Sequence, residues 1–161
     1  MRSLMAACLF AALAASGFAA DGPPTRLTTN LLEQTSLLLD KAGNSQDSAT
    51  LLAHMASNVV VVVTFPKNPE IPQMTFSKEE YAQHLRQAWA ETKNVIIRRL
   101  STQYEIADDG QSAIATSTYR QAATLVDTGQ TFVSEGRQIS VINLIAGVAQ
   151  ATRIDMTISY E

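Results

Sequence analysis

Apolar side chains recur at two different spacings, and the change between them divides the chain into a mainly helical first part and a stranded second part. From residue 30 to residue 43 the spacing is three or four, which is typical of one face of an amphipathic helix. The residues of this apolar face are Leu31, Leu32, Thr35, Leu38 and Leu39. Asn30 and Glu33 have the spacing of a capping box, and Gly43 is placed to end the helix in a left-handed conformation. A second short helix is predicted from about residue 47 to residue 56.

A buried strand and a third helix follow. Val59–Val63 is a run of five valines, which favours a strand covered on both faces. Residues 65–74 contain three prolines and are predicted to form a loop. Ser77 and Glu80 form a second capping box, which predicts a helix from about residue 78 to residue 92.

After residue 94 the pattern has period two. It predicts strands over 95–107, 111–126, 130–145 and 148–160, separated by glycine-containing hairpin turns. The order of elements predicts an α+β domain, with three N-terminal helices packed on a curved antiparallel sheet.

This element order resembles the nuclear transport factor 2-like superfamily, which includes SnoaL-like domains. The segment Thr75–Tyr81 is similar to that family's usual lead into its third helix. The resemblance covers about residues 30–160 and implies a cone-shaped fold with an interior pocket. It implies either an enzyme or a domain that binds a ligand or a partner without catalysis.

Strand alternation predicts which residues face this pocket. A two-residue turn at Asp109-Gly110 pairs residue 104 with residue 115 and residue 100 with residue 119. It places Ile96, Arg98 and Leu100 on the inner face together with Tyr104. Two registers remain for the next hairpin. If residues 127–129 form a three-residue turn, Val133, Ile139, Val141 and Ile145 face inward, and this more apolar register is preferred. A two-residue turn presents Phe132, Ile142 and Leu144 instead. The last strand is expected to contribute Val148, Ile154, Met156, Ile158 and Tyr160.

The preferred register gives a set of ligand-binding candidates: Tyr104, Tyr119, Arg98, Gln121, Glu135, Arg137 and Trp89. It also predicts an Arg98–Glu135 contact, because buried charges usually pair. Two alternatives stay open. In the first, Leu85 and Trp89 of the third helix fill the interior pocket. In the second, the row that contains Arg98 and Glu135 lies in solvent at the open end of the sheet.

Catalytic chemistry has less support in the sequence. His54 and His84 are candidates for a general base, but no carboxylate stands at a spacing that pairs with either. Arg153 and Asp155 share a strand face that is predicted to point outward. Two separated histidines make a poor metal site, and no phosphate-binding loop occurs, so neither metal nor cofactor is expected. The sequence therefore favours a small amphipathic ligand or a protein partner, including a homodimer through the outer sheet face. An acid–base enzyme of the isomerase or dehydratase type and an envelope assembly or immunity-type protein are the alternatives.

Charge and cysteine usage narrow the setting. Met1–Ala19 has one early arginine, an apolar run from Leu4 to Ala15 and a small-x-small ending, as in a secretory signal peptide. Cleavage removes the only cysteine, Cys8, and leaves a flexible leader over residues 20–29 and a domain over residues 30–161. We expect a periplasmic or secreted protein without a membrane span. The 15 acidic residues outnumber the 12 basic ones, which argues against nucleic acid as a partner.

Overall fold

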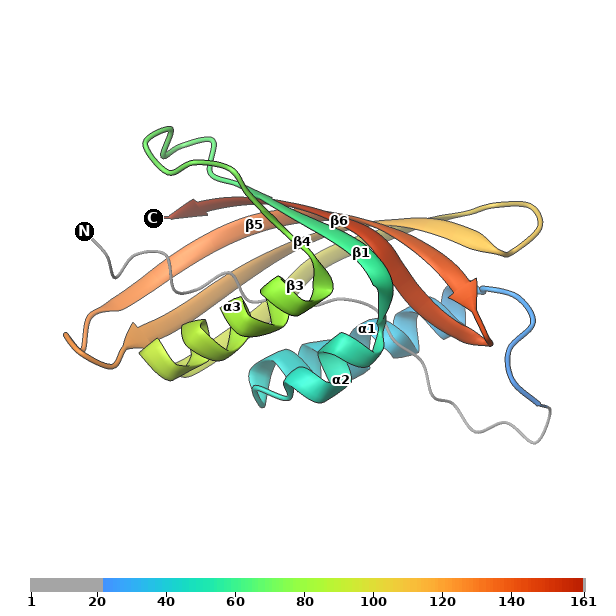
Figure 1. Ribbon diagram of the computed structural model, residues 1–161, viewed down its shortest axis with the longest axis horizontal. Helices are drawn as coiled ribbons and strands as arrows, with labels where there is room; N and C mark the ends of the chain where they lie inside the picture. Colours follow the sequence, from blue (N-terminus) through green and yellow to red (C-terminus); the bar gives the residue numbers. More distant parts are fainter. Residues whose placement is uncertain (1–21, 161) are drawn as a thin grey trace.

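The computed structural model describes residues 22–160, which contain three helices and six strands (Figure 1). The helices are α1 (Thr29–Asn44), α2 (Ser48–Ala53) and α3 (Lys78–Glu91). The strands are β1 (Met55–Thr64), β2 (Met74–Phe76), β3 (Thr92–Ile106), β4 (Ser112–Leu125), β5 (Thr131–Ile145) and β6 (Val148–Tyr160). The predicted elements are present, and β2 is a short strand that the sequence did not indicate. No helix within residues 22–160 is long and apolar enough to cross a membrane.

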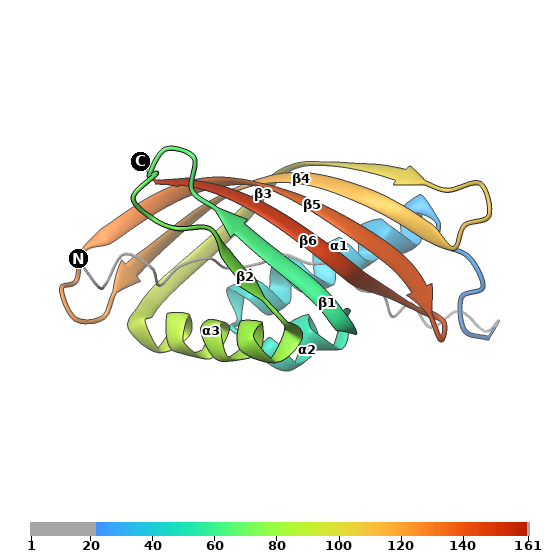
Figure 2. The same cartoon turned by 45° about the horizontal axis from the view of Figure 1, so that its top comes forward.

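The six strands form one curved sheet in the order β2-β1-β6-β5-β4-β3. Strand β1 runs parallel to β6, so the prediction of an antiparallel sheet is wrong for this pair, while every other neighbouring pair is antiparallel. The sheet arches over the helices, which all lie on its concave side (Figure 2). Strand β3 is one edge of this sheet, and α1 lies against it.

The core lies between the helices and the concave face. Leu32 and Leu39 of α1 and Leu85 of α3 are fully buried there, against Val61 of β1 and Ile154 of β6. Burying each such aliphatic side chain stabilises the fold by about 1.5–3 kcal/mol, which is what holds the helices to the sheet.

The helix ends correct part of the prediction. The N-cap of α1 is Thr28, whose hydroxyl accepts a hydrogen bond from the Leu31 N–H, so Asn30 lies inside the helix and the predicted Asn30–Glu33 capping box is wrong. Gly43 is also inside the helix, and the residue with positive φ, 57°, is Gln46. For α3 the predicted capping box is confirmed, because Ser77 and Glu80 bond each other's backbone N–H.

The segment before α1 is packed against the sheet rather than free. Leu27 is buried, and its N–H donates to the Gly110 carbonyl at 2.7 Å. The Gln111 side chain donates to the Thr25 carbonyl at 3.0 Å. The described part of the predicted leader thus contacts the rest of the domain through Thr25 and Leu27. The predicted signal peptide lies outside the described residues.

A one-residue β-bulge in β3 changes which side chains face the core. Tyr104 pairs with Ala115 as predicted, and Ser101 pairs with Thr118, but Arg99 rather than Leu100 pairs with Tyr119. Leu100 is the extra residue. Because each bulge reverses the alternation, Arg99 faces the concave side, and the expectation that Arg98, Ile96 and Leu100 do so is wrong.

The β4–β5 hairpin follows the register that the sequence ranked second. Thr124 pairs with Thr131 and Gln121 with Ser134, across a loop of residues 126–129. The side chains that face inward therefore include Phe132, Ile142 and Leu144, as the alternative predicted, and the preferred set is wrong. Another bulge, at Thr152 in β6, turns Ala149 inward in place of Val148, while Ile154, Met156 and Ile158 are buried as predicted.

Candidate functional site

A groove of about 600 Å³ separates α1 from the edge strand β3. Its walls are one face of the helix and the bulged part of the strand. The lining residues are Glu33, Ser36, Leu37, Asp40, Ile97, Arg98, Arg99, Leu100, Ser101, Thr102 and Tyr104. The helix residues are spaced by three or four positions, which places them on one side of α1. The groove thus combines apolar walls with hydroxyl groups and two pairs of opposite charges.

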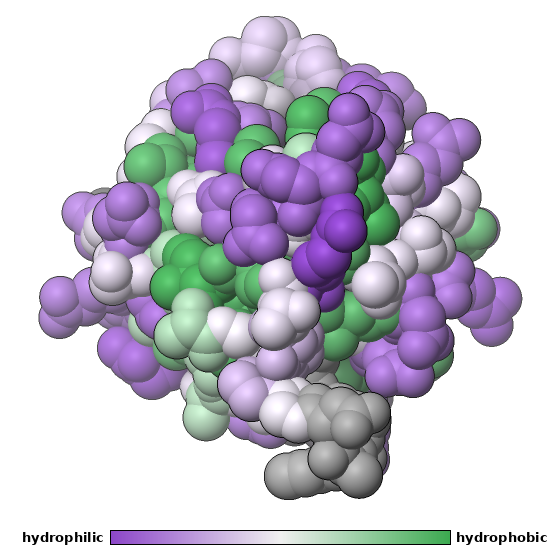
Figure 3. Space-filling model, turned by 90° about the vertical axis from the view of Figure 1, so that its right-hand side faces the viewer, coloured by the Kyte–Doolittle hydropathy of each residue, from purple (hydrophilic) through white to green (hydrophobic). Residues whose placement is uncertain are grey.

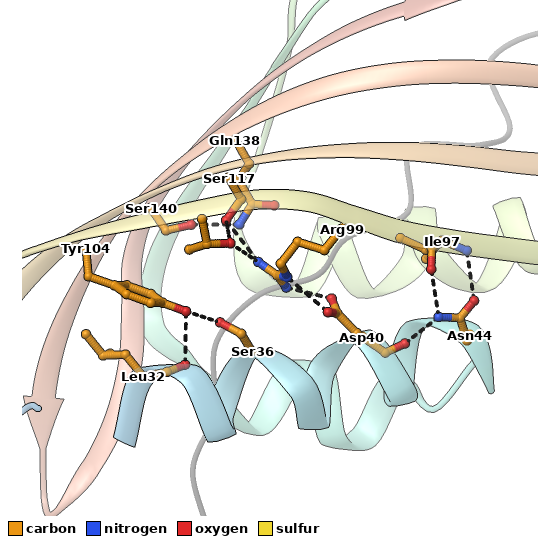
Figure 4. A network of polar contacts seen from close by, with 11 residues as sticks. Leu32, Ser36, Asp40, Asn44, Ile97, Arg99, Tyr104, Ser117, Gln138 and Ser140 are labelled. Atoms are coloured by element: carbon orange, nitrogen blue, oxygen red, sulfur yellow. Dashed lines mark hydrogen bonds and ion pairs between the residues drawn. The ribbon is translucent and has the colours of Figure 1, made fainter. Parts of the chain in front are cut away.

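An ion pair joins the two walls of the groove (Figure 4). Arg99 Nε donates to Asp40 Oδ2 at 2.9 Å, and Arg99 Nη2 donates to Asp40 Oδ1 at 2.6 Å. Both side chains are largely shielded from solvent. Arg99 Nη1 donates to Ser117 Oγ at 2.9 Å and to Thr102 Oγ1 at 3.3 Å. Arg99 is therefore fixed between the helix and the interior of the sheet.

Further contacts tie α1 to β3 on either side of this ion pair. The Asn44 amide accepts from the Ile97 N–H at 2.8 Å and donates to the Ile97 carbonyl at 3.1 Å, so it satisfies the backbone of the edge strand as a further strand would. At the other end of the groove, the Tyr104 hydroxyl lies 2.7 Å from Ser36 Oγ and donates to the Leu32 carbonyl at 3.3 Å. Burial raises the pKa of Tyr104, so this phenol stays protonated near neutral pH.

A patch of buried polar side chains lies behind the groove, on the concave face of β4 and β5. Its members are Ser117, Tyr119, Gln121, Ser134, Gln138 and Ser140, each no more than 5% exposed. They occupy neighbouring rows of the sheet, since Ser117 pairs with Gln138 and Gln121 with Ser134. Tyr119 pairs with Gly136, where a Cβ atom would lie only 2.4 Å from the tyrosine ring. Gly136 therefore gives the Tyr119 ring its place on the sheet.

The structure separates the predicted ligand-binding residues into two groups. Tyr104, Tyr119 and Gln121 face the concave side, and Trp89 is half-buried against the core. Arg98, Glu135 and Arg137 are exposed and belong to the convex side, although Arg98 also borders the groove.

Assigning Glu135 and Arg137 to the pocket is therefore wrong, whereas Arg98 is an exposed residue of the groove lining. The predicted Arg98–Glu135 contact is wrong too, because Arg120 of β4 pairs with both residues and separates them. Arg99 and Asp40 were not among the predicted site residues. The adjacent arginines at 98 and 99 were the available signal, because a single bulge exchanges which of them faces inward.

Neither histidine is oriented for acid–base catalysis. His54 ends α2, and its Nδ1 has no hydrogen-bond partner. The His84 ring stacks on Phe76 with centroids 4.9 Å apart, and its Nε2 has no partner either. Burial lowers the pKa of both histidines, so both are neutral at pH 7. Within residues 22–160, no cluster of three His, Cys, Asp or Glu side chains could hold a metal ion.

Arg153 and Asp155 form an ion pair at 2.7 Å on the exposed face, as the strand pattern predicted. They lie on the side of β6 opposite the core residues Ile154 and Met156. The Arg153 and Asp155 side chains therefore point away from the concave side and do not contribute charge to the groove.

No family profile matches this sequence, and no curated protein matches it. Solved structures do resemble its fold. Hexachlorocyclohexane dehydrochlorinase LinA-type3 from Novosphingobium barchaimii LL02 matches with a TM-score of 0.60 and 12% identity, over 78% of this chain and 84% of that one. An NTF2-like protein of unknown function from Pseudomonas putida KT2440 matches with a TM-score of 0.55 and 16% identity, over 73% and 77%. A ketosteroid isomerase-like protein from Erwinia carotovora atroseptica SCRI1043 matches with a TM-score of 0.53 and 16% identity, over 74% and 85%. The chain thus has the nuclear transport factor 2-like fold that its element order predicted.

Proposed function

We propose that this chain, with its nuclear transport factor 2-like fold, binds a small amphipathic molecule on the concave side of its sheet without transforming it. The observation that carries this proposal is the buried polar patch behind the α1–β3 groove. Core residues are normally apolar, and a buried polar group costs free energy unless it has a partner. A patch of six such residues beside an open groove is typical of a binding site.

The size and lining of the groove support the same function. Pockets for small organic molecules enclose about 300–1,000 Å³ and combine apolar walls with a few placed polar groups. Here Leu37, Ile97 and Leu100 are apolar wall residues, while Thr102 and Tyr104 present hydroxyl groups. A molecule with an apolar body and one or two polar atoms fits this lining.

The hydrogen-bond partners of the titratable side chains favour binding over catalysis. A general base needs an orienting partner and access to a substrate proton. Neither His54 nor His84 has a hydrogen bond to a carboxylate among the described residues, and Asp40 is held by Arg99. The second candidate function, an acid–base enzyme, rests on the likeness of the fold to a dehydrochlorinase and to a ketosteroid isomerase-like protein.

A protein partner bound at the end of the molecule shown in Figure 3 is a weaker alternative. The end of the molecule seen in Figure 3 is mostly hydrophilic, with separate hydrophobic patches. Stable partner surfaces usually present a larger continuous apolar area. We also propose that the protein acts in the periplasm, on the pattern of residues 1–19, and cell fractionation of the full-length chain tests this.

The test is native mass spectrometry of the protein expressed with its leader and purified from the periplasm. We expect a bound molecule that is released on denaturation. Thr102→Phe places a ring in the groove and should remove the molecule. The matched control Thr116→Phe changes a threonine of the neighbouring strand that points to the convex side, and should retain it. A bare wild-type chain would count against the proposed function, and a chemically altered molecule after incubation would favour the enzyme.

A further inference from the structure

Two buried side chains near the concave face carry N–H groups that have no acceptor. Gln121 is 1% exposed, and its Nε2 has no hydrogen-bond partner among the described residues. Trp89 is the only tryptophan of the chain, and its Nε1 is also buried without a partner. Both atoms can only donate a hydrogen bond. Each of these two N–H groups can therefore form a hydrogen bond only with an acceptor atom.

Leaving such a donor unsatisfied is costly. A buried N–H without a partner destabilises the folded state because it has lost its hydrogen bonds to water, whereas an oxygen brought by a ligand removes that cost. Nearby polar groups are already engaged, as in the hydrogen bond from Gln138 Nε2 to Ser140 Oγ at 2.7 Å. The Gln121 amide is thus the available donor of the buried patch.

The register places Gln121 directly behind the groove. Ile97, which lines the groove, is the cross-strand partner of Gln121, and Arg99 is the partner of Tyr119 two residues away. Gln121 and Arg99 are therefore diagonal neighbours on the same face, about 7–8 Å apart between Cα atoms, and long side chains reach across that distance. Four of the five N–H bonds of Arg99 are used, and the remaining one is on Nη2.

The charged side chains around the groove determine whether a charged or an uncharged ligand oxygen is favoured. Arg99 is the one basic residue that faces inward on β3–β6 within the described chain, and Asp40 already neutralises it. Glu33 and the exposed Arg98 also line the groove, so its charged side chains already balance. An anionic ligand would place a second negative charge beside Asp40 in a poorly solvated site, which is unfavourable. An uncharged oxygen accepts a hydrogen bond without that cost.

From these contacts we infer that the ligand is an uncharged, largely apolar molecule with a hydrogen-bond-accepting oxygen, such as an ester or amide carbonyl, bound by the Gln121 side-chain amide. This inference rests on the proposed function and specifies its ligand class. Trp89 Nε1, on α3, is a second donor without a partner among the described residues.

Three probes of similar size separate the ligand classes: methyl benzoate, benzoate and propylbenzene. Titrations of the 15N-labelled protein are followed by NMR, where Trp89 gives a single indole N–H signal. We expect methyl benzoate to bind at least about tenfold more tightly than benzoate and to move the Trp89 indole and Gln121 side-chain signals downfield. Gln121→Leu should weaken methyl benzoate about fivefold to tenfold, the equivalent of one lost hydrogen bond, and leave propylbenzene unchanged or tighter. The control Gln103→Leu, on the convex side of β3, should change neither affinity.

Equal affinity for propylbenzene and methyl benzoate, or a preference for benzoate, would overturn the inference and leave the proposed binding function standing. Failure of all three probes to bind would also overturn it, and the proposed function would fall with it only if the native mass spectrum showed a bare chain. If Gln121→Leu does not fold, the ranking of the three probes on the wild-type protein still decides the outcome.

Discussion

The carboxylate of Asp40 on α1 accepts two hydrogen bonds from the guanidinium of Arg99 on β3, at 2.6 Å and 2.9 Å. Arg153 and Asp155 repeat this two-bond pairing on the exposed face of β6, with both distances at 2.7 Å. The two ion pairs differ in exposure: the side chains are 14% and 20% exposed in the first and 53% and 39% in the second. They form a natural comparison of a shielded and a solvated ion pair.

Removing the shielded carboxylate should destabilise the fold. Asp40→Ala leaves Arg99 charged and poorly solvated, and we expect the free energy of unfolding to fall by about 2 kcal/mol. Asp155→Ala removes an ion pair of the same geometry that is exposed to solvent, and it should leave the urea midpoint unchanged. Urea unfolding followed by circular dichroism measures both. Equal effects of the two substitutions would contradict the importance assigned to shielding.

Adding one methyl group at Gly136 should disturb Tyr119. A Cβ atom there lies 2.4 Å from the tyrosine Cζ, so Gly136→Ala forces the ring to move and should cost about 1–3 kcal/mol. The substitution Tyr119→Leu removes the clashing atoms. In the double variant Gly136→Ala/Tyr119→Leu, the alanine should therefore cost much less than it does alone. Additive losses in thermal unfolding would show that the close approach is not the cause.

The start of α1 offers a test of which residue caps it. Thr28→Ala removes the hydroxyl that accepts the Leu31 N–H, and should lower stability by about 1 kcal/mol. Asn30 has the residue type of a cap but lies within the helix. Asn30→Ala should therefore be neutral or slightly stabilising in the same denaturation experiment, since alanine has the higher helix propensity. A larger loss of stability for Asn30→Ala than for Thr28→Ala would indicate that Asn30 is the N-cap, as the sequence predicted.

The buried histidines should make stability depend on pH. Burial lowers the pKa of His54 and His84 in the folded protein below the value of 6.5 that applies when they are exposed. The unfolded chain then binds more protons as the pH falls through 6.5, so stability is full above 6.5 and is lost between 6.5 and the lowered folded pKa.

Thermal unfolding between about pH 7.5 and about pH 5.5 measures this effect. His84→Phe keeps the aromatic contact with Phe76 and removes one titrating group, so its melting temperature should fall less over the same range. A wild-type melting temperature that rises on acidification would contradict the lowered pKa values.

Local sequence signals located the elements well where the chain itself supplies the interaction. The Ser77–Glu80 capping box places the start of α3, because both hydrogen bonds lie within four residues. The valine run predicts a strand, and Val61 and Val63 of β1 are fully buried, but Val60 is 38% exposed, so the expectation that both faces are covered is wrong. The Asp109-Gly110 turn sets the pairing of Tyr104 with Ala115 next to it. The candidates Tyr119 and Gln121 were found in this way.

The sequence by itself thus determined the order of helices and strands and the inner face of β4, since periodicity and turn residues act over short distances. Only the tertiary structure decided that Arg99 rather than Arg98 faces the concave side, and that Glu135 and Arg137 face away from it. A one-residue bulge or a longer loop reverses every later side chain of a strand, and neither leaves a local mark in the sequence. The choice rests on packing against α1, where Asp40 and Asn44 hold the bulged edge of β3.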